Sequence, residues 1–385
     1  MLNDSAPYLL DVTRLVWRRW VGRHPTCIDR VCLAYLDHFR ANAQAVVQHR
    51  RIRRILDREA SAVLFDLLAS PRARFKLSFI AQTLRYGFRN SCEGRNRVYL
   101  NVGHTGLEDD GFRDWLDAAD VRPVYFVHDL IPITHPQFCR SGEQTKHRTR
   151  MRTVLTTSAG VIANSGVTLG ELSTFARQEG LANPPSVSAL LGSDAVPAGS
   201  TSVRPERPTF VVVGTIEARK NHLMLLQLWT RLIERMGTTA PHLLIIGQRG
   251  WECEDVLDLL DSSERLKIAV TELNQCDDRS LAGHLSGARA LLFPSIVEGY
   301  GLPLVEALRA GVPVIASDVP VFREIAGGIP DYLDPVDLPA WERTVLSYSE
   351  FDSMQREQQL RRLDSYRAPT WGDHFAAVDP WIDRL

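Results

Sequence analysis

Short apolar runs alternate with longer amphipathic stretches through both halves of the chain. Runs of four or five apolar residues bounded by turn residues are typical of buried strands, and strands that alternate with helices build parallel sheets. The first run lies in the N-terminal YLLDV. The later runs are 98–102, 124–127, 160–163, 187–191, 210–213, 242–246, 290–293 and 312–316. The pattern predicts an α/β protein with doubly wound parallel sheets.

The chain is too long for a usual single core. It has 385 residues, of which 44% are hydrophobic and 24% charged, which is ordinary for a globular protein of two domains. The segment 196–208 is rich in Pro, Ser and Arg and has no apolar period, so it is the predicted linker. We therefore expect one domain at 1–195 and a second at 209–368, followed by a last helix within 369–385.

The stretch 290–318 is the most informative for function. Its apolar strand leads through a glycine-containing turn into a helix expected at 302–309, with a proline in the first helical turn and a glycine just past the end. Glu298 lies in the turn and Glu306 lies on the helix. A helix N-terminus favours an anion, and carboxylates accept hydrogen bonds from sugar hydroxyls. A strand-turn-helix with two solvated glutamates is the alternative interpretation.

A second candidate site follows the apolar run at 210–213. The loop carries Arg219 and Lys220 just before a predicted helix, where two cations oppose the positive end of the helix dipole. A diphosphate bound there would offset their charge, and the cations would stabilise it as a leaving group. The alternative is a solvated basic loop.

His128 directly follows the run at 124–127. Ligands of open α/β sheets bind outside the carboxyl ends of the strands, which is where this histidine is expected. A structural histidine is the alternative. His128, Asp129 and His135 lack the spacing of hydrolytic metal motifs, so we expect no metal site.

The segment from Glu298 to Glu306 resembles the Glu-x7-Glu signature of the retaining GT-B glycosyltransferases of family 4. The resemblance implies two Rossmann-like domains that face a cleft, with acceptor bound by the first and a nucleotide-sugar donor by the second. It implies that Glu298 binds hydroxyls of the transferred sugar and that Glu306 binds the nucleotide ribose. The residues that would line the sugar and diphosphate are Gly299, Tyr300, Gly301 and Leu302.

The same resemblance assigns roles in the other segments. Lys220 stands at the family's diphosphate-binding lysine, and Arg219 is taken as the second cation because Thr215 stands where many members have arginine. His128 would lie beside the transferred sugar. Thr26 and Cys27 occupy a phosphate-contacting turn in which related enzymes carry Thr-Gly. The last helix, 369–385, would cross back to the first domain.

The expected reaction is hexosyl transfer with retention, by front-face attack and without metal or cofactor. By analogy with bacterial polysaccharide mannosyltransferases, the expected donor is GDP-mannose and the acceptor a glycan or a lipid-diphosphate-linked glycan. UDP-glucose or another nucleotide sugar is a near alternative. A sugar-nucleotide epimerase and a non-catalytic partner subunit are rivals, the latter because of Cys27 and Thr215.

The net charge of −1 conceals an asymmetry between the two halves. Residues 1–190 hold 26 Lys and Arg against 18 Asp and Glu, a net of +8, and residues 191–385 hold 19 against 28, a net of −9. Basic runs lie at 14–23 and 50–54. They favour an anionic membrane surface or a lipid diphosphate over nucleic acid, because the chain shows no recognisable nucleic-acid-reading module. A solvated arginine-rich face is equally compatible.

The chain has no run of 18 apolar residues and no apolar signal-peptide core near its start. We therefore expect a cytoplasmic protein, peripheral on the inner membrane. The six cysteines are scattered without C-x-x-C pairs, which predicts free thiols.

Overall fold

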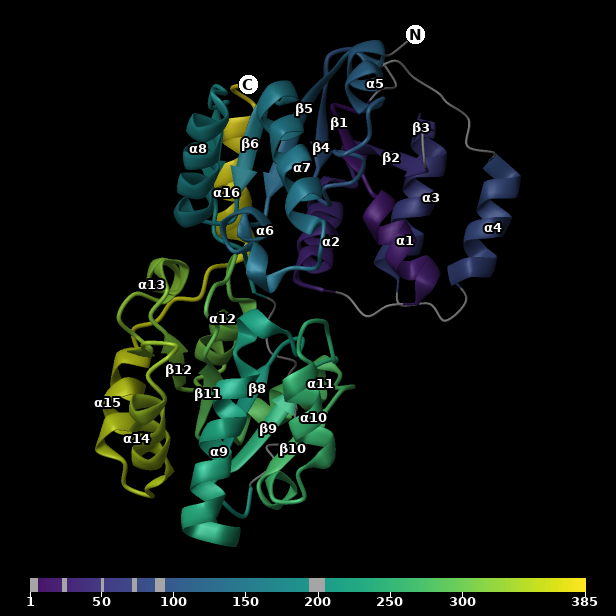
Figure 1. The fold of residues 1–385 in the computed structure, drawn as a ribbon. Coiled ribbons are helices and arrows are strands. Elements are labelled where there is room, and N and C mark those ends of the chain that lie inside the picture. The colour runs from purple at the N-terminus through teal and green to yellow at the C-terminus, as the bar shows by residue number, and fades with distance from the viewer. Residues whose placement is uncertain (1–5, 23–25, 50–51, 71–74, 87–93, 194–204) are drawn as a thin grey trace. The chain divides into compact units, whose positions relative to one another are not determined.

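The computed structural model describes residues 6–22, 26–49, 52–70, 75–86, 94–193 and 205–385. The chain forms two compact units (Figure 1). Unit 1 comprises Met1–Leu130, Thr145–Ala189 and His374–Leu385, and unit 2 comprises Ile131–Gln144 and Leu190–Asp373. Most of the expected linker, 196–204, lies outside the described residues.

Within the described residues, unit 1 contains a seven-stranded sheet in the order β3-β2-β1-β4-β5-β6-β7. Neighbouring strands are parallel except β2 and β3, which are antiparallel. His49 pairs with Ile52, and so short a connection can only return the chain antiparallel. The strands are β1 (Tyr8–Asp11), β2 (Ala43–His49), β3 (Ile52–Ile55), β4 (Arg97–Asn101), β5 (Val121–Val127), β6 (Gly160–Ala163) and β7 (Ser186–Ser188).

Helices flank this sheet, and their ends carry standard caps. Asp57 accepts a hydrogen bond from the Ala60 amide at the start of α3, and Gly180 ends α8 in the left-handed conformation. The helices of unit 1 are α1 (Thr13–Val21), α2 (Cys27–Phe39), α3 (Arg58–Ala69), α4 (Phe75–Tyr86), α5 (Phe112–Ala119), α7 (Glu143–Thr157), α8 (Gly166–Glu179) and α16 (Trp371–Ile382). Most of α16 belongs to unit 1, although the chain enters it from unit 2.

Unit 2 contains a six-stranded sheet, parallel throughout, in the order β10-β9-β8-β11-β12-β13. This is the 3-2-1-4-5-6 order of the dinucleotide-binding fold, which reverses direction between its first and fourth strands. In unit 2 the reversal lies between β8 and β11, and in unit 1 it lies between β1 and β4. The strands are β8 (Thr209–Val213), β9 (His242–Ile246), β10 (Val270–Leu273), β11 (Ala290–Phe293), β12 (Val314–Ser317) and β13 (Asp331–Leu333).

The core of unit 2 is built on α9, which buries Trp229 and a row of leucines against the sheet together with Phe210 and Trp341. The helices of this unit are α6 (Ile131–Thr134), α9 (His222–Met236), α10 (Glu254–Ser262), α11 (Asp278–Ser286), α12 (Leu302–Arg309), α13 (Pro320–Ala326), α14 (Leu338–Ser349) and α15 (Met354–Leu363), with 3-10 turns η1 (Pro136–Phe138), η2 (Ala218–Lys220), η3 (Gly237–Thr239) and η4 (Leu266–Ile268).

The structure confirms the α/β class and the two doubly wound sheets, with β3 as the antiparallel exception. No disulfide joins the described cysteines, whereas Cys92 lies outside the described residues. Across the described ranges, no helix is both long and apolar enough to traverse a bilayer. In the same ranges, no three or more His, Cys, Asp or Glu side chains are grouped to hold a metal ion.

Candidate functional site

Two loops meet at the point in unit 2 where the strand order reverses. One loop follows β8 and the other follows β11, and these two strands are hydrogen-bonded neighbours. The Ile296 amide donates to the Arg219 carbonyl at 2.8 Å, and the Asn221 side chain donates to the Pro294 carbonyl at 3.2 Å. The loops therefore form one joined structure at the edge where ligands of such sheets bind.

Glu298 lies at the centre of a charge cluster made of Glu217, Arg219, Lys220 and Glu298. Its Oε2 accepts from Arg219 Nη1 at 2.7 Å, and its Oε1 accepts from Lys220 Nζ and from the Ser295 hydroxyl, the latter at 2.8 Å. Arg219 Nη2 lies 2.6 Å from an oxygen of Glu217. The structure thus brings together three residues expected at the donor site and adds Glu217, which the sequence analysis did not single out.

The charge cluster is buried, and its cations keep Glu298 ionised. The side chain of Glu298 is 7% exposed. Burial alone would raise the pKa of this carboxyl, but Arg219 and Lys220 lower the pKa to about 2. An ionised carboxylate can only accept hydrogen bonds, so its remaining lone pairs suit sugar hydroxyls. Burial has the opposite net result at Glu217, whose pKa is raised despite the attraction of Arg219 and Lys220.

The charge cluster contains two carboxylates and two cations, so its formal net charge is zero. Attraction of an anion to this site must therefore also come from backbone amides. Helices α9 and α12 both begin at this edge, and neither has a side-chain N-cap hydrogen bond. Their first-turn amides and positive dipole ends are suited to a diphosphate. Gly214 lies beside Lys220, and its φ of 142° favours glycine, whereas an added Cβ would make only ordinary contact, 3.4 Å from Lys220 Cε.

The turn between Glu298 and α12 is held tightly. Gly301 has φ of 127°, and an added Cβ would lie 2.8 Å from a ring carbon of Phe322. The buried Tyr300 donates its hydroxyl to the Leu191 carbonyl at 2.9 Å, so any contact of Tyr300 with a sugar would come from its main chain. Gly299 and the buried Leu302 complete the turn and start the helix.

Glu306 lies on α12, partly exposed. Its position one to two turns into the helix agrees with the location expected from the sequence. Its contact with a nucleotide ribose stays a prediction.

His128 lies in unit 1, directly after β5, and is 5% exposed. Its Nε2 is 2.7 Å from the Val102 carbonyl, which can only accept, so this nitrogen carries the proton and Nδ1 is an acceptor. Burial lowers the pKa of His128 to about 4, against the raising influence of the Val102 hydrogen bond and Asp129. The imidazole is therefore neutral at pH 7.

Thr26 and Cys27 start α2 in unit 1. Thr26 forms a capping box with Asp29, whose Oδ2 accepts from the Thr26 amide at 2.7 Å and from its hydroxyl at 2.8 Å. Asp29 also contacts Arg14 and Arg18. The N-terminus of α2 thus already holds a carboxylate. Cys27 is exposed in the first turn, and a phosphate contact of this pair stays a prediction.

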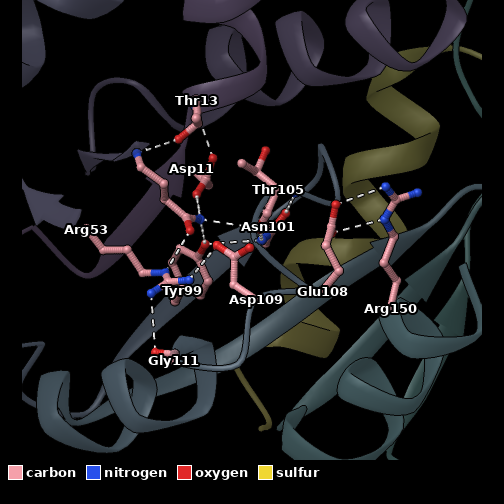
Figure 2. A network of polar contacts seen from close by, with 11 residues as sticks. Asp11, Thr13, Arg53, Tyr99, Asn101, Thr105, Glu108, Asp109, Gly111 and Arg150 are labelled. Carbon is pink, nitrogen blue, oxygen red and sulfur yellow. Dashed lines mark hydrogen bonds and ion pairs between the residues drawn. The ribbon is translucent and has the colours of Figure 1, made fainter. Parts of the chain in front are cut away.

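A buried polar network at the strand-order reversal of unit 1 was not expected from the sequence (Figure 2). Asp11 ends β1 and accepts from Gln48 Nε2 at 2.5 Å and from the Tyr99 hydroxyl at 2.8 Å. Asn101 ends β4 and donates to the same hydroxyl at 3.1 Å, and Arg53 donates to Gln48 at 2.9 Å. These contacts fix the carboxyl ends of β1, β2 and β4, the edge at which His128 also lies.

One part of the chain matches the model of a known protein family. Residues 199–328 match the family model of glycosyl transferases group 1, and this range includes the charge cluster and α12. Among related sequences, the serotype-specific mannosyltransferase WbdA of Escherichia coli is 30% identical over 236 residues, 55% of this chain and 28% of WbdA. O-antigen chain mannosyltransferase B of Escherichia coli is 32% identical over 159 residues, 41% of each chain.

The matches thus cover less than half the length of these two relatives. Among solved structures, HepE of Anabaena, determined in complex with UDP, superposes with a TM-score of 0.64 at 14% identity, covering 98% of this chain and 99% of HepE. Similarity at this identity concerns the fold, which is of the GT-B class.

Proposed function

We propose that this protein is a retaining glycosyltransferase that moves mannose from GDP-mannose to a hydroxyl of a glycan or lipid-linked glycan during assembly of a cell-surface polysaccharide. The observation that carries the proposal is the charge cluster, in which Lys220 and Arg219 flank the ionised Glu298 beside the starts of α9 and α12. The group 1 domain and the relatives named as mannosyltransferases support the transfer of mannose.

In the proposed reaction, the acceptor hydroxyl attacks the anomeric carbon on the face that the diphosphate leaves. The new C–O bond forms as the bond to the phosphate oxygen breaks, and the hydroxyl proton passes to that oxygen of the departing GDP. Lys220, Arg219 and the two helix starts stabilise the negative charge that develops on the diphosphate, so no metal is required.

Glu298 suits sugar binding better than proton transfer or nucleophilic attack. A carboxyl with a pKa of about 2 is a weak base at neutral pH, and both of its oxygens already accept hydrogen bonds from the protein. We assign it to the hydroxyls of the transferred sugar. Glu306 is assigned to the ribose, and the neutral His128 of unit 1 to the sugar as a hydrogen-bond acceptor through Nδ1.

The acceptor is assigned to unit 1, at the edge fixed by the polar network of Asp11 and Asn101. A lipid-linked acceptor requires the enzyme to work on a membrane surface. We therefore propose that it acts at the cytoplasmic face of the inner membrane as a peripheral protein.

The test combines nucleotide binding with transfer. The purified protein is titrated with GDP, UDP, ADP and CMP, and transfer from GDP-mannose and from UDP-glucose is measured. We expect selective binding of GDP and transfer from GDP-mannose. Lys220→Ala should lower turnover about 100-fold or more, because it removes a donor to the leaving group.

Lys267→Ala is the matched control, since Lys267 is an exposed lysine of the same unit. It should leave binding and turnover unchanged. Nucleotide binding without transfer to any acceptor would favour a non-catalytic partner subunit, and release of free nucleotide without acceptor would favour an epimerase. Transfer from UDP-glucose alone would overturn the assignment of donor.

A further inference from the structure

Helices α1 and α4 of unit 1 share an exposed face that mixes apolar and basic side chains. Trp17 is 51% exposed and Ile80 is 45% exposed, which is uncommon for residues of this size. The rings of Trp20 and Phe79 lie edge to face with their centroids 6.1 Å apart, and Lys76 Nζ lies 5.7 Å from the centroid of the Trp20 ring. The two helices therefore present one surface, here called the aromatic-basic face, made of Trp17, Trp20, Val21, Lys76 and Ile80.

The helices that carry this face are positively charged. Their sequences, TRLVWRRWV and FKLSFIAQTLRY, contain five basic residues and no acidic residue. Asp29 pairs with Arg14 and Arg18 and offsets one of these charges. Arg19 donates to the neutral carbonyl of Leu68, which leaves its charge in place.

The other basic run of unit 1 contributes its Arg53 to the polar network. Arg53 is buried and bonded to Gln48 and Asp109 within the polar network (Figure 2). Arg50 and Arg51 lie outside the described residues. Ile52 of this run is 59% exposed but stands alone, whereas α1 groups the exposed side chains of Trp17, Trp20 and Val21. Among the described residues of the two runs, those of α1 therefore combine positive charge with a group of exposed apolar side chains.

The aromatic-basic face lies beside the edge to which the acceptor is assigned. Helix α1 begins two residues after β1, and Arg14 is so close to the turn after β4 that a Cβ added to Gly103 would lie 2.9 Å from the Arg14 Cβ. Arg14 and Arg18 also hold Asp29 in the first turn of α2. A surface docked on this face would thus contact the helix whose first residues lie at the carboxyl ends of β1 and β4.

We propose that the aromatic-basic face docks unit 1 on an anionic lipid surface. Tryptophan rings prefer the boundary between water and hydrocarbon, and each Lys or Arg near an anionic leaflet is attracted by its negative surface potential. A second copy of the chain would bring like charges together across a two-fold axis. Nucleic acid would match the charge but would leave Val21 and Ile80 without an apolar partner. The docking on a lipid surface is argued from the face alone. The suggestion that the same surface carries the acceptor rests on the proposed function.

The test is sedimentation of the full chain with vesicles of phosphatidylcholine alone and of phosphatidylcholine with phosphatidylglycerol. We expect binding to the anionic vesicles, weakened by salt, and little binding to the neutral ones. Lys76→Glu should weaken binding about fivefold or more. The double variant Trp17→Ser, Trp20→Ser should weaken binding on the order of tenfold or more.

Phe351→Ser is the matched control, because Phe351 is a fully exposed aromatic residue of unit 2. It should bind vesicles as the unchanged chain does, and all variants should keep their unfolding temperature. Equal binding by the double tryptophan variant would overturn the proposal. So would a dimer that this variant converts to monomer, or an oligonucleotide that binds through the same residues.

Nucleotide binding to the same variants separates this proposal from the proposed function. The aromatic-basic face lies in unit 1 and the charge cluster in unit 2, so face variants should bind nucleotide normally. Loss of vesicle binding with intact nucleotide binding supports the face. Absence of nucleotide binding in the unchanged chain would count against the donor assignment alone.

Discussion

At the scale of single residues, Glu217 sets the net charge of the charge cluster. Its carboxylate contacts Arg219 at 2.6 Å, and the four side chains together are neutral. Glu217→Gln should leave Arg219 held by Glu298 and the Val297 carbonyl while giving the cluster one positive charge. We expect nucleoside diphosphates to bind about fivefold more tightly, measured by calorimetry, because a nearby negative charge is removed.

Turnover of Glu217→Gln should fall, since the diphosphate product leaves more slowly. Glu217→Asp keeps the charge and should bind nucleotide like the unchanged chain. Glu254→Gln neutralises an exposed glutamate in the first turn of α10 and controls for the charge of the unit as a whole. Weaker nucleotide binding by Glu217→Gln would mean that Glu217 is needed to orient Arg219.

The buried His222 is expected to make the stability of unit 2 fall at acid pH. Neither of its ring nitrogens has a hydrogen-bond partner among the described residues, and burial together with Lys220 lowers its pKa to about 3. The unfolded chain takes up this proton near pH 6.5, so the stability held above that pH is lost as pH falls toward 3. His222→Leu should flatten the fall in stability, by on the order of a few kcal/mol at the acid end.

The measurement is the free energy of unfolding between pH 7 and 4, from denaturant titrations. At pH 7 we expect His222→Leu to be as stable as the unchanged chain or more so, because it removes a buried polar group that lacks a partner. His284→Leu, in α11, serves as the control and should keep the original pH profile. An unchanged profile in His222→Leu would show that other groups dominate.

At the scale of elements, the start of α12 depends on Gly301. An alanine there would place its Cβ 2.8 Å from Phe322 and would have to keep a φ of 127°. Gly301→Ala should therefore displace the first turn of α12 and weaken nucleotide binding about tenfold or more.

Gly311→Ala is the control for Gly301→Ala, because it introduces backbone strain at α12 without a steric clash. Gly311 follows the other end of α12 with φ of 75°, and an added Cβ there meets nothing within 4 Å. It should cost about 1 kcal/mol of stability and leave nucleotide affinity unchanged. Nucleotide affinity that falls equally in both variants would show that strain anywhere in α12 is sufficient.

The elements that the sequence predicted best are those with continuous apolar runs. The strands at 160–163, 242–246 and 290–293 have the expected bounds, and α12 begins and ends as Pro303 and Gly311 indicate. Helix α1 and strands β2, β3, β10 and β13 were not expected. Three arginines divide the apolar residues of α1, of which only Leu15 is buried, and β13 is only three partly exposed residues, so neither has a clear period.

The candidate site likewise contains residues that the sequence predicted and residues that it did not. Arg219, Lys220 and Glu298 lie in local motifs after neighbouring strands, so sequence was enough to suggest that they meet. Glu217 escaped notice because a single acidic residue in a basic loop has no pattern of its own. The network of Asp11 and Tyr99 joins residues 88 positions apart, and only the sheet order places them together.

At the scale of the whole molecule, unit 1 is completed by residues 374–385. His374 is buried and lies 2.9 Å from the Tyr35 hydroxyl, and Phe375 stacks on His38 at 3.7 Å. Phe375→Ala should destabilise unit 1 by about 3–5 kcal/mol. Removal of 374–385 should leave unit 1 unable to form its full core, with α2 exposed.

Hydrogen exchange resolved by peptide is the measurement, because it reports the two units separately. Protection should fall in unit 1 and stay unchanged in α9 and the other helices of unit 2. Phe351→Ala, at a fully exposed phenylalanine, should change neither unit. Uniform loss of protection across both units would show that they unfold together.

The return of α16 to unit 1 also sets an order of events during synthesis. Most of unit 2 is one continuous stretch, Leu190–Asp373, whereas unit 1 needs both Met1–Leu130 and His374–Leu385. A ribosome releases the chain from its first residue onward, and domains generally fold as their residues emerge. Unit 1, most of which is synthesised before unit 2, can therefore complete its fold only after unit 2 has been translated. Until residues 374–385 emerge, the surface around Tyr35 stays uncovered.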